Sequence, residues 1–107
     1  MEDKKVHLVF KKVKELTKED RVLWREEADG STFYTSVSDY KIYIGKSVGT
    51  VSFELFNHHN EKIGMLEQGG YFDNSEGIDT FYEAVRKKVL KIDDGLDDLL
   101  NRLDQVE

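Results

Sequence analysis

The stretch from residue 32 to residue 66 constrains the fold most, because its side chains alternate in character with a period of two. Successive side chains of a β-strand point to opposite faces of a sheet, so this period predicts strands with one buried face. The alternating residues are Thr35, Val37, Ile42, Ile44, Val51, Phe53, Leu55, Ile63 and Met65. Polar interruptions at 38–39, 46–49 and 58–60 divide the stretch. We therefore predict a four-stranded antiparallel meander joined by hairpins.

Helical spacing replaces the alternation on both sides of this stretch. Apolar residues recur at steps of three and four in Val6, Val9, Phe10, Val13 and Leu16, in Ile78, Phe81, Val85, Val89 and Ile92, and in Leu96, Leu99, Leu100 and Leu103. The first group predicts a helix over 3–16, and the others predict two C-terminal helices, the last capped by Asp93 or Asp94. The whole predicts one α+β domain over residues 1–107, with all helices packed on one face of the sheet.

The segment that joins the first helix to the meander is harder to assign. Thr17 is a candidate cap for a second short turn, because Glu19 and Asp20 follow where carboxylates favour a helix start. Val22, Leu23 and Trp24 supply apolar bulk, and residues 19–26 fit a helix or a strand equally well. Residues 28–31 have turn composition.

Composition excludes several classes of protein. The 107 residues contain no cysteine, so disulfides, thiolate nucleophiles and cysteine-based metal sites are excluded. The first fifteen residues carry charges on every turn, which matches neither a signal peptide nor a membrane span. A net charge of -6 disfavours direct contact with nucleic acid. We expect a cytoplasmic protein that has no cofactor and contacts neither membrane nor nucleic acid.

The charges are distributed unevenly along the chain. Residues 1–18 hold six lysines against three acids, and residues 91–107 hold six acids against Lys91 and Arg102. One interpretation is that lysines late in the first helix and aspartates early in the last one complement the helix dipoles. The other is that the charges form a partner-binding patch. The sequence favours the first interpretation without excluding the second.

Two adjacent histidines, His58 and His59, raise the question of a metal site. Consecutive side chains of a strand diverge, and zinc needs three or four ligands, whereas the neighbours Asn57, Asn60 and Glu61 include a single carboxylate. Asparagine and histidine tolerate turn conformations well. We therefore predict a hairpin turn here and no metal.

Other candidate sites match their motifs poorly. Residues 73–77 lack the regular acidic positions of a calcium loop and indicate a helix-start loop, and Gly69 and Gly70 are not followed by a phosphate-binding fingerprint. The serines lie outside nucleophile-elbow motifs, and adjacent acidic pairs such as Asp97 and Asp98 diverge on a helix. We therefore predict that the protein is not an enzyme.

The outer face of the predicted sheet is the strongest candidate for a binding surface. If the aliphatic side chains face the helices, the opposite parity exposes aromatic and apolar residues among charged ones. The candidate partner-binding residues are Tyr34, Tyr43, Glu54, Phe56, Lys62 and Leu66, with Lys41 nearby. Such a set is typical of contact surfaces. Cross-strand pairing that merely shields the rings is the alternative.

The leading hypothesis is a small cytoplasmic, non-enzymatic protein-binding or regulatory module that acts through this outer face, either on a protein partner or on itself as a homodimer. A second hypothesis is an inhibitor that mimics nucleic acid with the acidic last helix, through Asp93, Asp94, Asp97 and Asp98. The third and weakest is a histidine-dependent metalloprotein that uses His58 and His59.

Overall fold

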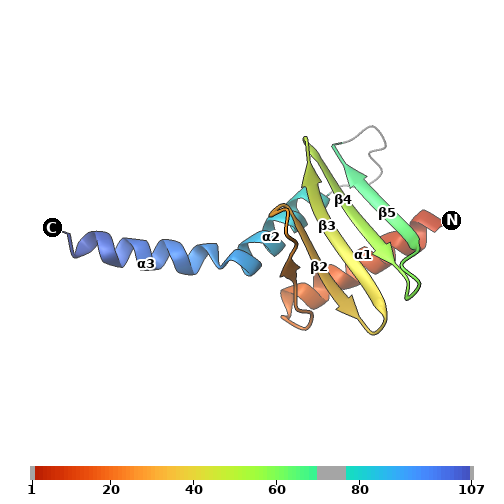
Figure 1. The fold of residues 1–107 in the computed structure, drawn as a ribbon, viewed down its shortest axis with the longest axis horizontal. Helices are drawn as coiled ribbons and strands as arrows, with labels where there is room; N and C mark the ends of the chain where they lie inside the picture. The colour runs from red at the N-terminus through yellow and green to blue at the C-terminus, as the bar shows by residue number, and fades with distance from the viewer. Residues whose placement is uncertain (1, 70–76, 107) are drawn as a thin grey trace.

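The computed structural model describes residues 2–69 and 77–106, which form an α+β fold. The elements are α1 (Glu2–Lys18), β1 (Arg25–Glu26), β2 (Thr32–Val37), β3 (Tyr40–Ser47), β4 (Thr50–Phe56), β5 (Lys62–Gln68), α2 (Ile78–Leu90) and α3 (Ile92–Asp104). The helix, meander, helix, helix order predicted from the sequence is confirmed (Figure 1). The first helix extends slightly beyond the predicted range of 3–16, and Ile92, which the sequence grouped with the second helix, begins α3.

The sheet is an antiparallel meander of five strands in the order β1-β2-β3-β4-β5, one strand more than predicted. The additional strand is β1, in which Arg25 pairs with Tyr34 and Glu26 pairs with Phe33. This pairing settles the ambiguous segment 19–26 as a connection that ends in a strand. A strand of two residues is too short to show a period, so sequence reasoning could not detect it.

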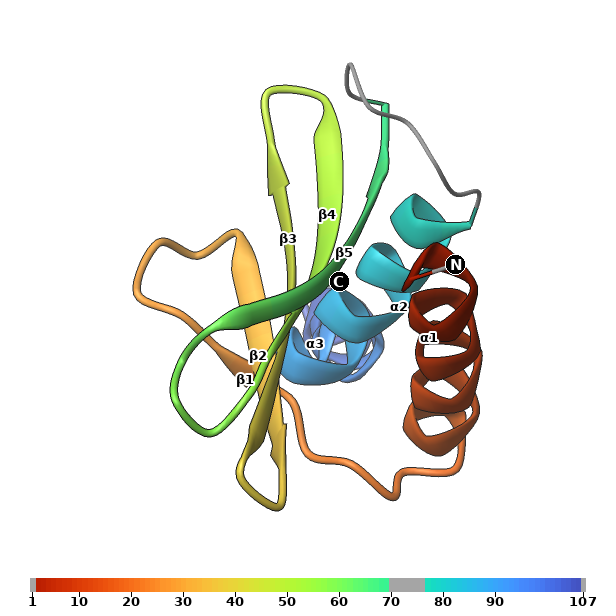
Figure 2. The same ribbon diagram turned by 90° about the vertical axis from the view of Figure 1, so that its right-hand side faces the viewer.

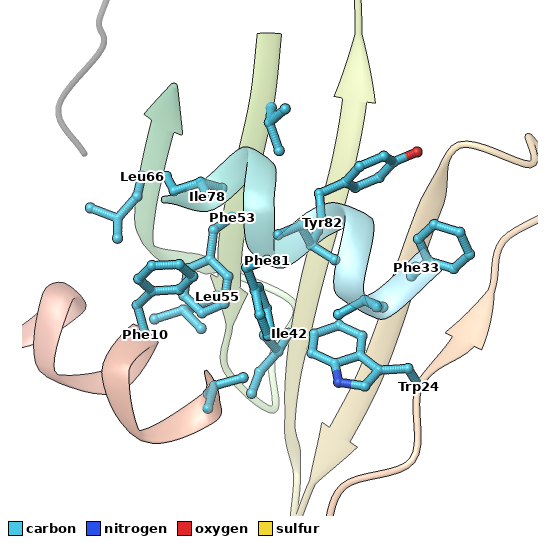
Figure 3. Packing of buried hydrophobic residues seen from close by; sticks show 14 of the residues in the cluster. Phe10, Trp24, Phe33, Ile42, Phe53, Leu55, Leu66, Ile78, Phe81 and Tyr82 are labelled. Carbon is cyan, nitrogen blue, oxygen red and sulfur yellow. The ribbon is translucent and has the colours of Figure 1, made fainter. Parts of the chain in front are cut away.

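The inner face of the sheet carries the core, and α1 and α2 cover it (Figure 2). One row across β2, β3, β4 and β5 consists of Phe33, Ile44, Phe53 and Leu66, which are all fully buried. Edge-to-face ring contacts join α1 to this row and to α2: the centroids of Phe10 and Phe53 are 4.8 Å apart, and those of Phe10 and Phe81 are 5.4 Å apart (Figure 3). The aromatic residues therefore join the two layers.

Thr17 lies inside the last turn of α1 and does not begin a second turn, so that prediction was wrong. Its hydroxyl donates to the carbonyl of Val13 at 2.8 Å and accepts a hydrogen bond from the Trp24 indole at 3.0 Å. Both side chains are buried. A buried hydroxyl requires such partners, so Thr17 and Trp24 fix the path of the chain as it leaves α1.

A bulge in β5 reverses the parity that the sequence predicts for its second half. Leu55 pairs with Gly64 while Phe56 pairs with Lys62, so Ile63 is an extra residue without a partner. One extra residue turns all following side chains to the opposite face. Leu66, predicted to be exposed, is therefore fully buried, and Ile63, predicted to face the core, is 51% exposed. Met65 correspondingly lies on the outer face, opposite Glu54.

The last helix does not pack on the sheet, which corrects the prediction that both C-terminal helices do. α3 projects away from the body of the protein (Figure 1), and the longest dimension of the molecule is 60 Å against 31 and 25 Å for the other two. The change of direction occurs at Lys91, which has a left-handed backbone with φ 52°. The helix begins at Ile92, so the predicted cap at Asp93 or Asp94 was also wrong.

Candidate protein-binding surface

No helix of the described chain covers the outer face of the sheet (Figure 2). The strand register places its side chains in rows that cross the strands. The row nearest the β2–β3 hairpin contains Ser36, Lys41, Phe56 and Lys62; the next contains Arg25, Tyr34, Tyr43, Glu54 and Met65; the third contains Thr32, Gly45, Ser52 and Glu67. The face thus has an aromatic half and a half rich in hydroxyl groups.

Three rings form a continuous group in the aromatic half, which we call the aromatic cluster: Tyr34, Tyr43 and Phe56. The centroids of Tyr34 and Tyr43 are 5.8 Å apart, and those of Tyr43 and Phe56 are 5.3 Å apart at an angle of 82°. These are the separations and tilts that favour aromatic pairs. All three side chains are only half-buried, so part of each ring faces solvent.

Charged side chains border the aromatic cluster. Lys62 forms an ion pair with Glu54, and its ammonium group lies 6.0 Å from the centroid of the Phe56 ring. Within residues 2–69 and 77–106, by contrast, no ion pair involves the exposed Lys41. Of the two cations beside the cluster, Lys62 is neutralised by Glu54, whereas Lys41 can bind an acidic group of a partner.

A shallow hollow of about 440 Å³ opens beside the rings. Lys41, Tyr43, Glu54, Phe56 and Asn60 line it. Two aromatic walls, one cation and one carboxylate can receive an apolar side chain together with a polar or charged neighbour. Cross-strand pairing that only shielded the rings would not require a hollow lined by two opposite charges.

The hydroxyl-rich half is organised by the turn that precedes β2. The Asp29 carboxylate accepts hydrogen bonds from the backbone amides of Ser31 and Thr32, each at 3.0 Å, and from the Thr32 hydroxyl at 2.9 Å. These hydrogen bonds, the one from Ser31 foremost, hold the pKa of Asp29 below its usual value. These hydrogen bonds satisfy the Asp29 carboxylate within the turn. Asp29 and Thr32 therefore serve to hold the turn in place.

Five of the six residues predicted for the site lie on the outer face: Tyr34, Tyr43, Glu54, Phe56 and Lys62. Leu66 does not, because the bulge at Ile63 turns it into the core. Sequence reasoning missed Arg25, which the short strand β1 brings beside Tyr34, and Met65, which the bulge turns outward. No pattern in the sequence marks either of these events.

His58 and His59 lie in the β4–β5 connection, and the predicted hairpin turn is confirmed. The Asn57 side-chain oxygen accepts hydrogen bonds from the amides of His59 and Glu61, at 2.9 and 3.0 Å. Asn60 has φ 61°, and the imidazole centroids are 4.0 Å apart. Among the described residues, no group of three or more potential ligands is placed to hold a metal ion.

The segment between β5 and α2 concerns two other predictions. The helix-start interpretation of residues 73–77 and the question of a phosphate contact at Gly69 and Gly70 involve residues 70–76, which lie outside the described residues.

In the part of the chain that the structure describes, each helix is too short or too polar to cross a lipid bilayer. Searches against protein-family models, curated protein sequences and solved structures find no match to this chain.

Proposed function

We propose that the protein is a non-enzymatic binding module that recognises a protein partner through the aromatic cluster. The fitting partner segment carries an aromatic or large aliphatic side chain for the hollow and an adjacent carboxylate for Lys41. This extends the hypothesis drawn from the sequence, with Leu66 removed from the contact set and Arg25 and Met65 added as neighbours.

The observation that supports this function most is the hollow beside half-exposed rings. Tyr43 and Phe56 form its aromatic walls, and Lys41 and Glu54 supply opposite charges within the same depression. Binding energy at protein interfaces concentrates in a few aromatic anchors that lose water in a pocket, while surrounding charges set orientation and encounter rate. Lys41 has no ion pair in the described chain, so it can bind an acidic group without first losing a partner.

Replacement of Tyr34 and Tyr43 by serine together tests this function. A photo-crosslinking residue at position 62 of the otherwise unchanged chain would first capture and identify the partner, and the affinity of the purified pair would then be measured by calorimetry. We expect the double variant to bind at least about 10-fold more weakly, because loss of a single anchor typically exceeds 1.4 kcal/mol.

Tyr40→Ser is the matched control. Tyr40 lies on the same strand as Tyr43 and is 49% exposed, but it faces the other side of the sheet. It should leave the affinity unchanged. Lys41→Glu should weaken binding and reverse the sign of its salt dependence, because a carboxylate would then face the carboxylate of the partner. If the double variant binds as tightly as the unchanged chain and both are folded, the aromatic cluster is not the binding surface.

The two other hypotheses from the sequence predict different residues. A nucleic-acid mimic would depend on the aspartates of α3 and would be unaffected by Tyr34→Ser and Tyr43→Ser. A metalloprotein would gain thermal stability from added zinc through His58 and His59. The double tyrosine variant and the response of thermal stability to added zinc together separate the three hypotheses.

A further inference from the structure

The α3 helix carries an apolar stripe that no other element of the described chain covers. We call Leu96, Leu99, Leu100 and Leu103 the leucine stripe; they lie at helical spacing and are 54, 50, 60 and 53% exposed. Figure 1 shows the helix standing clear of the sheet and of α1. Four neighbouring leucines form an apolar patch of the kind that soluble proteins cover by contact.

α3 also has little to hold it together as an isolated helix. It has 13 residues, and helices of that length are marginal in water unless a partner buries one face. Gly95 lies in its first turn with nothing within 4 Å of the position that a Cβ would occupy. In the described part of α3, one side-chain pair, Arg102 with Asp98 at 2.9 Å, supports it internally. A partner for the leucine stripe would supply the missing stabilisation.

The same chain exposes an apolar groove that meets the edge of the aromatic cluster at Phe56. The groove has a volume of about 340 Å³ and runs between α1 and the sheet. Its apolar lining includes Val9, Val13 and Leu16 of α1 and Val37, Tyr40 and Ile63 of the sheet. Four of these are more than a third exposed, and the bulge at Ile63 contributes one wall.

The charges beside the groove and beside the leucine stripe are opposite. Lys12 and Lys41 line the groove, and Lys5 lies on the same side of α1 because 5, 9, 12 and 16 are three or four positions apart. On α3, Asp97 and Asp104 lie seven positions apart and follow one edge of the leucine stripe. A basic apolar groove and an acidic apolar helix of one chain are therefore complementary.

We propose that α3 of one copy of this chain binds in the apolar groove of a second copy, and that the exchange is reciprocal. A single residue, Lys91, separates α2 from α3, and it directs α3 away from its own body. A reciprocal exchange has two-fold symmetry and closes, whereas one-way binding would build filaments. The groove shares Lys41 and Phe56 with the hollow beside the aromatic cluster, whereas Tyr34 and Tyr43 do not line it and stay exposed in such a dimer.

Sedimentation of purified variants tests the exchange. The unchanged chain should be dimeric at micromolar concentration. Leu99→Asp with Leu103→Asp removes the leucine stripe, and Ile63→Asp blocks the groove at a side chain that is already exposed. Each variant alone should be monomeric, with a near-ultraviolet circular dichroism spectrum that shows a folded body. An equimolar mixture should dimerise, because the intact groove of the first variant receives the intact α3 of the second.

Further variants separate this arrangement from its rivals. Val48→Asp, at the fully exposed tip of the β3–β4 hairpin, and Tyr43→Ser, in the aromatic cluster, should both remain dimeric. Lys12→Glu should weaken the dimer at least several-fold, and Asp97→Lys in the same chain should restore it in part.

Three outcomes would overturn the proposal. A dimer that survives Ile63→Asp and a second groove variant, Val9→Asp, would show that leucine stripes pair with each other. A mixture that stays monomeric would exclude the reciprocal exchange, and a monomeric unchanged chain at all concentrations up to 1 mM, roughly the weak limit of specific association, would exclude self-association.

Discussion

At the scale of single residues, Val48 stands out because its backbone conformation and its chemistry conflict. It occupies the tip of the β3–β4 hairpin with φ 46°, next to Gly49 with φ 81°, and its side chain is 99% exposed. Two positive φ values are the geometry of a tight hairpin turn that favours Asn-Gly. A β-branched residue in the left-handed region is strained, and here no packing compensates for the strain.

Val48→Asn should therefore stabilise the protein. Asparagine adopts the left-handed conformation with much less strain, and we expect the free energy of unfolding to rise by about 1 kcal/mol. Urea unfolding followed by the fluorescence of Trp24, the single tryptophan of the chain, would measure it. Val48→Thr keeps the branched Cβ and should give no gain. Equal stability of the Asn variant and the original chain would mean that the turn is not strained.

Ile63 shows how one residue changes the assignment of several others. Because it is inserted opposite the Leu55–Phe56 step, Leu66 and Met65 exchange the faces predicted for them. The residues before the insertion, from Tyr34 to Lys62, keep the predicted parity, and they include five of the six residues of the predicted site. The alternation of side chains along a strand predicts which face each one occupies only as far as the first bulge.

At the scale of secondary-structure elements, β5 and α2 are linked by an unusual helix cap. The residue before α2 is Gly77, which has no capping side chain, and the Gln68 side-chain oxygen at the end of β5 accepts hydrogen bonds instead. These come from the amides of Ile78 at 2.8 Å and Asp79 at 3.1 Å. A strand residue ten positions earlier thus satisfies the start of the helix.

Gln68→Met should destabilise the protein, because it keeps the length of the side chain and removes the acceptor. We expect a loss of about 1 to 2 kcal/mol, comparable to loss of a local helix cap. Gln68→Glu retains an acceptor and adds a charge that favours a helix start, so its stability should match or exceed that of the original chain at neutral pH. Thermal unfolding of the original chain and the two variants would measure these differences in stability. An equal loss of stability in both variants would exclude a capping role for Gln68.

The boundary between α2 and α3 shows a limit of helical periodicity. Apolar residues continue at alternating steps of four and three through Val85, Val89, Ile92, Leu96 and Leu99, although the helix breaks at Lys91. The first part of this series packs on the core and the last part is exposed. The same spacing therefore occurs on a helix face that packs on the core and on one that is exposed. Periodicity predicts that a helix has an apolar face, but it does not predict what covers that face.

At the scale of the whole molecule, the protein consists of a packed body and a projecting helix. The buried cluster runs from Val6 to Val85 and includes none of the described side chains of α3. The basic character of α1 and the acidic character of α3 therefore lie on separate parts of the molecule. The sequence left open that these charges form a partner-binding patch. Our proposed dimer depends on that interpretation.

A chain that ends at Lys91 should fold with almost unchanged stability. The leucines of α3 are half exposed and do not belong to the core. Their removal should therefore change the free energy of unfolding of the body by less than about 1 kcal/mol. The comparison would use urea unfolding of the truncated chain and of the Leu99→Asp, Leu103→Asp variant, so that association does not contribute. A loss of several kcal/mol would show that α3 packs on its own body.

Side-chain patterns alone predict the α+β class, the order of helices and meander, most of the core and the parity of the outer face up to Phe56. These features follow from local periods of two and 3.6, which the side chains carry without reference to distant parts of the chain. Four features became visible only in the folded molecule: the pairing of β1, the bulge at Ile63, the cap from Gln68 and the projection of α3. Each of these depends on contacts between distant segments or on one backbone torsion, and neither leaves a repeating pattern in the chain.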